Sequence, residues 1–253
     1  MASTSTTPLR PAPVTYNDDE LDYLEAQCEE NVRQQHLFHA LDHVVKVLDS
    51  RNIPNAVMGG VSMILLGDQE RTTIDVDVAV EGKVGEILAA FSADDRVYLP
   101  RAMTVAASGV ARMFVLTGPA YGEAIQPALP VEVDLILNGN KGAPQTLTGA
   151  TRTLTVVTGL GPRQYAVLTL EYLFRAKLRS YYERASDKDY RDLVWMSFVH
   201  GEAVSTFIAD QDEDLRQHFA DAYAAENELL SESRVEWLYT LLSLRRRPRS
   251  SSS

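Results

Sequence analysis

The stretch Thr72-Thr73-Ile74-Asp75-Val76-Asp77-Val78-Ala79-Val80 decides the fold. It alternates in polarity and is rich in β-branched residues, which predicts a strand over residues 72–80. Because successive side chains point to opposite faces of a strand, Asp75 and Asp77 share one face and Val76 lies on the other. Two neighbouring carboxylates in apolar surroundings repel each other unless a cation neutralises them. Magnesium suits this pair, because it takes one or two carboxylates and completes its shell with water and phosphate oxygens.

A second acidic strand is expected at residues 131–137, where Glu132 and Asp134 alternate with apolar residues and so share a face. If this strand pairs beside residues 72–80, Asp134 lies next to Asp75 and Asp77. Three carboxylates then hold two magnesium ions, an arrangement that stabilises the attacking and leaving oxygens of an in-line displacement. Asp134 is the preferred third carboxylate, and Glu132 is the alternative.

A glycine pair, Gly59-Gly60, separates an expected strand at 56–58 from an expected helix at 61–66. Glycines at such a turn let the backbone approach a phosphate closely, and the helix N-terminus adds free N–H groups and a positive dipole end. Ser62 can add a hydroxyl donor. Arg71 is a candidate phosphate ligand, with a structural ion pair as the equal alternative.

The ordered residues of these motifs resemble the DNA polymerase β-like nucleotidyltransferase superfamily. Within it, the likeness is to minimal nucleotidyltransferases and to toxin-type relatives from bacterial abortive-infection systems. The residues that carry the resemblance are Gly59, Gly60, Val61, Ser62, Gly67, Arg71, Thr73, Asp75, Asp77 and, further along, Asp134. It implies that the glycine turn holds a triphosphate and that Asp75 and Asp77 ligate both metal ions. It also implies that Asp134 ligates one ion and helps to activate the acceptor hydroxyl.

The resemblance extends to the helical half of the chain. Relatives keep a lysine there that reaches the triphosphate, and Lys177 resembles it. Asp189 and Asp192 resemble the Lys-Asp-x-x-Asp pattern of the toxin-type relatives, although helix capping and ion pairing explain such acids more often. A pairing of Arg184 with Asp192 is expected to fix Lys177.

The function implied is a magnesium-dependent nucleotidyltransferase that moves a nucleoside monophosphate from a triphosphate such as ATP to an acceptor hydroxyl and releases pyrophosphate. One alternative is a non-catalytic nucleotide-binding regulatory protein with the same fold. A protein-interaction module, with no magnesium-dependent nucleotide affinity, is another.

The pattern along the chain predicts an α+β fold, a nucleotidyltransferase-type mixed sheet with flanking helices, followed by a C-terminal helical bundle. Expected boundaries are a disordered leader at 1–17, the sheet domain at 18–160, the helical domain at 161–245 and a disordered tail at 246–253. Outside the motifs, the expected elements are a helix or helix pair at 21–50, a helix at 83–91, strands at 111–116 and 153–157, and helices at 168–184, 190–200, 215–228 and 233–244.

The amino-acid composition indicates which classes of partner to expect. The formal net charge of −11 favours a small-molecule or protein acceptor over a long nucleic acid, which usually meets a basic surface. No apolar run approaches the roughly 18 residues of a membrane span, so no membrane partner is expected. The single cysteine, Cys28, excludes an internal disulfide and favours a cytoplasmic location. His36, His39 and His43 share a helix stripe, but no acidic partner motif accompanies them, which disfavours a metal site there.

Overall fold

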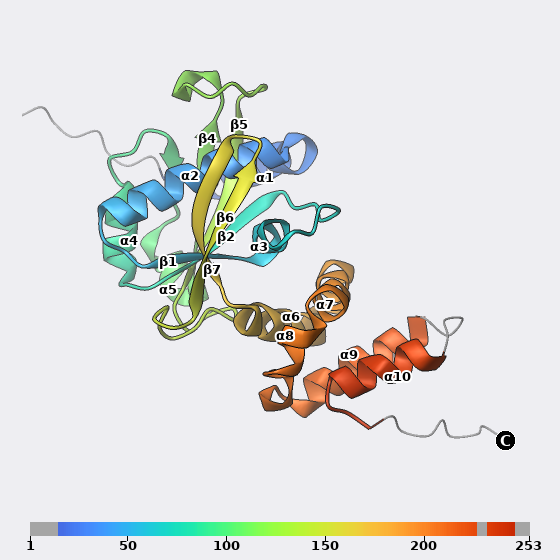
Figure 1. The fold of residues 1–253 in the computed structure, drawn as a ribbon. Coiled ribbons are helices and arrows are strands. Elements are labelled where there is room, and N and C mark those ends of the chain that lie inside the picture. Colours follow the sequence, from blue (N-terminus) through green and yellow to red (C-terminus); the bar gives the residue numbers. More distant parts are fainter. Residues whose placement is uncertain (1–14, 227–231, 246–253) are drawn as a thin grey trace, which may run out of the picture. The chain divides into compact units, whose positions relative to one another are not determined.

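The structure of the protein is a computed structural model that describes residues 15–226 and 232–245 (Figure 1). The chain divides into two compact units, Met1–Val167 and Leu168–Ser253. The expected leader and tail lie outside the described residues, except for residues 15–17. There, Thr15 forms a parallel bridge with Leu99, and the backbone N–H of Tyr16 donates to the carbonyl of Leu99 at 3.3 Å. These two residues therefore belong to the ordered fold and not to a leader.

The first unit is built on a seven-stranded mixed sheet, which confirms the expected fold class. Its strands are β1 (Asn55–Met58), β2 (Asp75–Val80), β3 (Val97–Tyr98), β4 (Val110–Thr117), β5 (Leu129–Leu137), β6 (Thr151–Thr158) and β7 (Gly161–Leu168), in the spatial order β3-β4-β5-β2-β1-β7-β6. β2 pairs in parallel with β5, and β1 in parallel with β7, whereas β1 and β2 are antiparallel, as are β4 and β5.

The central strand β2 has two unlike faces. Val76, Val78 and Val80 are fully buried, and Asp75 and Asp77 lie on the opposite face and are half-buried. The strand is shorter than expected, because residues 72–74 precede the ladder. The sheet also runs further than expected: β7 occupies residues 161–168, where the sequence predicted no strand.

Helices surround this sheet as α1 (Asp18–Asn31), α2 (Gln34–Ser50), α3 (Gly59–Leu66), α4 (Val84–Phe91), α5 (Ala102–Ser108) and the 3-10 turn η1 (Pro119–Tyr121). Helices α1 and α2 form a helix pair, in the region where the sequence predicted either one helix or two. Asn17 and Glu20 form a reciprocal capping box at the start of α1, which satisfies two backbone N–H groups that have no partner within the helix.

Helices α1 and α2 both pack on the sheet. α2 buries a stripe at helical spacing, Leu37, Leu41, Val44 and Leu48, and crosses strands β1, β2, β4 and β5. On α1, Leu24 and Cys28 pack against Phe114 of β4, with Tyr16 edge-on to the same ring. Because Phe114 stands opposite Glu132 in the β4–β5 ladder, α1 covers the face of the sheet that carries the acidic residues.

The second unit is helical, as expected, with α6 (Leu170–Arg184), α7 (Asp187–Val199), α8 (Gly201–Ser205), the 3-10 turn η2 (Ile208–Asp210), α9 (Glu213–Glu226) and α10 (Glu232–Leu241). Its core is aromatic: Tyr181 of α6, Tyr190 of α7 and Phe219 of α9 meet with ring centroids 5.6–6.4 Å apart. Within the described residues of both units, no helix is long and apolar enough to cross a bilayer.

Candidate functional site

Four carboxylates line one face of two adjacent strands. Asp75 of β2 is in register with Glu132 of β5, and Asp77 with Asp134. Residues directly opposite in a ladder point to the same face, and neighbouring strands lie about 4.8 Å apart. The structure therefore brings Asp134 beside the Asp75/Asp77 pair and keeps Glu132 on the same face.

Asp75 is held by a neighbour from just before its strand. The hydroxyl of Thr73 donates to Oδ1 of Asp75 at 2.5 Å. Residues 72–74 thus leave the ladder but still orient the acid that follows them.

The glycine turn lies directly against Asp77. Gly59 begins α3 with φ +61°, in the left-handed region, and a Cβ added there would lie 1.7 Å from Oδ2 of Asp77. Only a glycine lets this carboxylate sit so close to the backbone at the helix start. The turn and the acid pair therefore form one site.

Three further residues contribute to the turn: Gly60, Arg71 and Ser62. A Cβ at Gly60 would lie 2.6 Å from the Thr73 hydroxyl and 3.2 Å from Nη2 of Arg71, so the Arg71 guanidinium borders the turn. Whether Arg71 serves a phosphate or a structural ion pair stays open. Ser62 is fully buried, and its hydroxyl donates to the carbonyl of Gly59 at 2.7 Å. In this structure Ser62 therefore stabilises the turn from inside.

The sequence predicts magnesium-dependent triphosphate binding at this turn, and Gly59→Ala is expected to abolish it. Alanine in the left-handed region costs about 1–2 kcal/mol, and its methyl group forces Asp77 away. Calorimetry with ATP, GTP, CTP and UTP measures the binding, and thermal unfolding measures the stability. Gly67→Ala is the matched control: Gly67 also has positive φ, +110°, but nothing lies within 4 Å of its Cβ position. Equal binding by the two variants would contradict the expectation.

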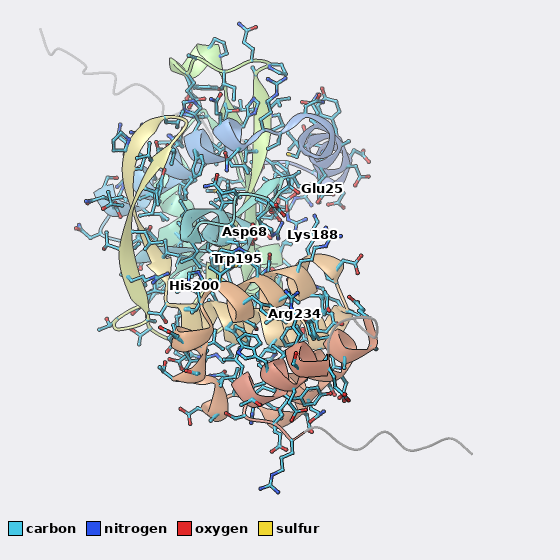
Figure 2. The ribbon with its side chains drawn as sticks, turned by 45° about the vertical axis from the view of Figure 1, so that its right-hand side comes forward. Glu25, Asp68, Lys188, Trp195, His200 and Arg234 are labelled. Atoms are coloured by element: carbon cyan, nitrogen blue, oxygen red, sulfur yellow. The ribbon has the colours of Figure 1, made fainter. Side chains whose placement is uncertain are left out.

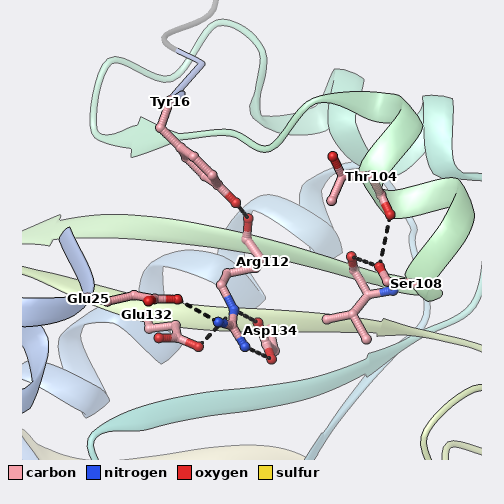
Figure 3. A network of polar contacts seen from close by, with 8 residues as sticks. Tyr16, Glu25, Thr104, Ser108, Arg112, Glu132 and Asp134 are labelled. Carbon is pink, nitrogen blue, oxygen red and sulfur yellow. Dashed lines mark hydrogen bonds and ion pairs between the residues drawn. The ribbon is translucent and has the colours of Figure 1, made fainter. Parts of the chain in front are cut away.

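Arg112 of β4 is the centre of a second set of contacts on the same face (Figure 3). Its Nε lies 2.9 Å from Oε1 of Glu132 and 3.1 Å from Oδ1 of Asp134, and its Nη2 lies 3.4 Å from Oδ2 of Asp134. Its Nη1 donates to Oε1 of Glu25 on α1 at 2.7 Å; Glu25 is also labelled in Figure 2. One guanidinium thus joins three carboxylates from two elements.

The pKa values of this set reflect crowding of negative charge. The pKa of Glu132 is raised to about 7, first of all by burial; Arg112 lowers it, and Asp134, Asp75 and Glu25 contribute to the rise. Burial also raises the pKa of Asp134, again opposed by Arg112. Burial lowers the pKa of Arg112, but Asp134, Glu132 and Glu25 outweigh it, so the net shift is upward and the guanidinium stays charged.

Glu132→Gln should raise the stability of the metal-free protein at high pH. The folded pKa of about 7 exceeds the ordinary value of 4.5, so the folded state holds the proton more tightly. The stability that this bound proton gives the wild-type protein is fully present below pH 4.5. It is lost as the pH rises through 7, and the loss amounts to up to about 3 kcal/mol. Urea unfolding from pH 4.5 to 8 should therefore show the two proteins diverging as the pH increases. Glu86→Gln, at an exposed position of α4, is the control, and its unfolding free energy should follow that of the wild type at every pH. If the unfolding free energy of Glu132→Gln also followed the wild type, the raised pKa of Glu132 would be contradicted.

The donor set of Asp75 and Asp77 suits magnesium, because two carboxylates beside a glycine turn match its preference for a few protein oxygens plus substrate oxygens. Asp134 lies beside this pair, as expected, and Arg112 also binds it. Over residues 15–226 and 232–245, no group of three or more His, Cys, Asp or Glu side chains is arranged to hold a metal ion. Magnesium binding by Asp75 and Asp77 stays a prediction from the sequence.

Comparison with known proteins agrees with this architecture. No family model and no curated protein matches the sequence. Among solved structures, an antigenic nucleotidyltransferase-like protein from Paracoccidioides brasiliensis superposes with a TM-score of 0.52 at 18% identity, covering 81% of this chain and 94% of its own. This chain has a nucleotidyltransferase-like fold.

Two further solved structures are similar at lower TM-scores. A candidate nucleotidyltransferase from H. pylori has a TM-score of 0.45 at 14% identity, covering 84% of this chain and 95% of its own. Another candidate nucleotidyltransferase, from Thermotoga maritima, has a TM-score of 0.38 at 18% identity. The match covers 62% of this chain and 92% of the other.

Lys177 is buried in the helical unit between two acids. Its Nζ lies 2.9 Å from Oδ1 of Asp189 and 2.7 Å from Oδ2 of Asp192, and both carboxylates are buried. Burial lowers the pKa of Lys177, but Asp192 and Asp189 outweigh it and raise it. Arg184 pairs with Asp189 at 2.8 Å, so the expected pairing of Arg184 with Asp192 is wrong. A role for Lys177 on the triphosphate stays a prediction.

The three histidines of α2 have separate partners. His36 contacts the carbonyl of Pro127 at 3.0 Å, His39 lies 3.4 Å from Glu123, and His43 lies 2.7 Å from Asp94. His36 and His39 therefore link α2 to the connection between η1 and β5, and His43 links it to the segment before β3.

Arg112 and Glu25 belong to the site although no sequence motif singles them out. The signal for Arg112 was present: it is the one charged residue of the otherwise apolar run Val110-Ala111-Arg112-Met113-Phe114-Val115. A charged residue among buried neighbours needs a partner, and the acidic strand was the nearest source of one. Nothing in the local pattern of α1 distinguishes Glu25 from its acidic neighbours.

Proposed function

We propose that this chain is a magnesium-dependent nucleotidyltransferase that moves a nucleoside monophosphate from a nucleoside triphosphate to an acceptor hydroxyl. The observation that carries the proposal is the register of β2 and β5, which aligns Asp75 and Asp77 with Glu132 and Asp134 beside the Gly59-Gly60 turn. Charge crowding of this kind, next to a helix start, suits a polyphosphate accompanied by a divalent cation.

Each residue has a distinct task in this reaction. The turn at Gly59 and Gly60 cradles phosphate oxygens with backbone N–H groups, and Arg71 adds a guanidinium at its border. Lys177 is proposed as a further triphosphate ligand, from the family resemblance. Magnesium, when bound by Asp75 and Asp77, supplies positive charge to the phosphate oxygens.

The proton of the acceptor hydroxyl goes to Asp134, whose pKa is raised by burial and which therefore accepts a proton more readily than an exposed aspartate. The acceptor oxygen bonds to the α-phosphorus, the bond from that phosphorus to the bridging oxygen breaks, and pyrophosphate leaves. The protein contributes alignment and charge stabilisation.

The acceptor is proposed to be a small molecule or a protein side chain, on the strength of the formal net charge of −11. A cytoplasmic location is proposed with it, because the lone Cys28 is buried and donates to the carbonyl of Pro130 at 3.4 Å. A buried thiol of this kind needs no oxidising compartment.

Two measurements test the proposal. Calorimetry with the four ribonucleoside triphosphates, with and without magnesium, should find one nucleotide whose binding depends on the ion. Incubation of that triphosphate, labelled at the α-phosphate, with cell extract and magnesium should transfer label and release pyrophosphate. Binding without transfer in any extract would favour the alternative, a nucleotide-binding regulatory protein, and no binding at all would contradict both.

A further inference from the structure

The helical unit contains a pocket that the proposed reaction does not use. It lies where α7, α9 and α10 meet, has a volume of about 440 Å³, and is lined by residues of this unit. Small-molecule sites in proteins usually have volumes of about 300–1,000 Å³, and in helical bundles they lie between helices. The pocket is therefore of a size to admit a small ligand of its own.

Aromatic rings form the inner surface of this pocket. Tyr190 of α7 and Tyr223 of α9 are buried, and Trp195 of α7 lines the pocket beside them. Trp195 is held edge-on against His200 with ring centroids 5.0 Å apart (both are labelled in Figure 2). Tyr190 packs against Phe219 of the aromatic core at 5.9 Å. Rings that are fixed in this way offer flat faces on which another aromatic ring can stack at little cost in entropy.

Charged side chains line the outer part of the pocket, and positive charge exceeds negative charge there. Arg191 and Arg234 carry guanidinium groups, and Glu226 opposes them with one carboxylate; all three residues are exposed. The guanidinium of Arg234 lies 4.7 Å from the centre of the Phe198 ring and forms a hydrogen bond with the side chain of Tyr223. Both of these partners are uncharged, so they position the guanidinium without neutralising it.

We propose that this pocket binds a planar aromatic molecule that carries one anionic group, such as an aromatic carboxylate. The ring stacks against Trp195, and the anionic group pairs with Arg191 and Arg234, whose planar guanidinium groups suit carboxylate oxygens. Glu226 disfavours a second anionic group beside the first. The inference does not depend on the proposed function, because the pocket residues are distinct from those proposed to bind the triphosphate and magnesium.

The probe for the test is 2-naphthoate, a flat two-ring carboxylate, added to the full chain. Its neutral amide, 2-naphthamide, has the same shape without the charge, and cyclohexanecarboxylate has the charge without the aromatic ring. Calorimetry should give 2-naphthoate a Kd of about 1 mM or tighter, as expected for a ligand of this size. The two comparison compounds should bind about tenfold more weakly, the scale of a lost charge-assisted hydrogen bond or stacking contact.

Fluorine NMR of protein made with 5-fluorotryptophan locates the bound probe. The chain has two tryptophans: Trp195 lines the pocket, and Trp237 stacks on Phe198 with ring centroids 4.6 Å apart. The probe should shift the Trp195 resonance more than the Trp237 resonance, and Trp195→Phe and Trp237→Phe assign the two signals. If the Trp195 resonance does not shift, or if the neutral amide shifts it as strongly as the carboxylate does, the proposal is overturned.

Two charge variants should change binding in opposite directions. Arg191→Met should weaken 2-naphthoate binding by about fivefold, because it removes an ion pair with the carboxylate. Glu226→Gln should strengthen binding by about twofold, because it removes a like charge at an exposed position. Arg179→Met, which breaks an exposed pair with Glu183 on α6, is the matched control and should leave binding unchanged.

The exposed positions of these side chains make the variants suitable for the comparison, because their replacement leaves the buried core of the unit in place. Equal binding of 2-naphthoate by Arg191→Met and Arg179→Met would show that no guanidinium of the pocket recognises the anionic group, and would overturn the proposal.

Discussion

Asp77→Asn is expected to reduce nucleotidyl transfer by about a thousandfold or more, the scale of losing a main electrostatic contact to the reacting group. Asn keeps the shape of the side chain against Gly59, which lies so close that a Cβ there would be 1.7 Å from the carboxylate oxygen. It removes the charge that, with Asp75, would hold the magnesium. Single-turnover transfer of α-labelled phosphate measures the loss.

The fold should tolerate this change. Asn matches Asp in size and leaves neither a cavity nor a clash against Gly59, so Asp77→Asn should remain folded, which thermal unfolding checks. Asp95→Asn, at an exposed aspartate before β3, is the matched control and should retain full transfer. Wild-type turnover by Asp77→Asn would remove Asp77 from the mechanism.

Lys177→Met is expected to destabilise the helical unit by about 3–5 kcal/mol, the usual cost of leaving buried charge uncompensated. The change removes the ammonium that lies 2.9 Å from Asp189 and 2.7 Å from Asp192, two buried carboxylates. Urea unfolding followed by tryptophan fluorescence suits the measurement, because both tryptophans of the chain, Trp195 and Trp237, belong to this unit.

Controls separate a structural role of Lys177 from a nucleotide-binding one. Arg179→Met breaks an exposed pair with Glu183 and should cost well under 1 kcal/mol. Adding Asp189→Asn and Asp192→Asn to Lys177→Met removes the uncompensated charges and should restore much of the stability. If Lys177→Met unfolds like the wild type and yet loses triphosphate binding, the buried ion pairs do not matter for stability and the ligand role predicted from the sequence is supported.

The sequence predicted the parts of the fold that depend on local periodicity. The alternation of Asp75 and Asp77 with valines predicted both the strand and its acidic face, and the same reasoning placed Glu132 and Asp134 together. The long helices of the second unit followed from their apolar spacing. Strand β7 was missed because it begins Gly161-Pro162-Arg163-Gln164, a start with turn and polar residues that hides its apolar end.

The contacts across the site depend on the register in which the strands pair. No local sequence pattern determines that register. Arg112 reaches Asp134 because β4 and β5 pair antiparallel with these residues opposite each other. Shifting that register by one residue would turn the guanidinium to the other face. In the same way, Arg184 is closer in sequence to Asp189 than to Asp192, and the turn between α6 and α7 decides which acid it meets.

The pairing of β2 with β5 also has a consequence for synthesis on the ribosome. Asp77 and Asp134 are neighbours in the sheet, yet the intervening 56 residues (78–133) must be translated first, and they include β3, α5 and β4. A nascent chain that has exposed β2 alone carries Asp75 and Asp77 without the strand that completes the cluster. The acidic cluster therefore assembles only once residues beyond 134 have left the exit tunnel.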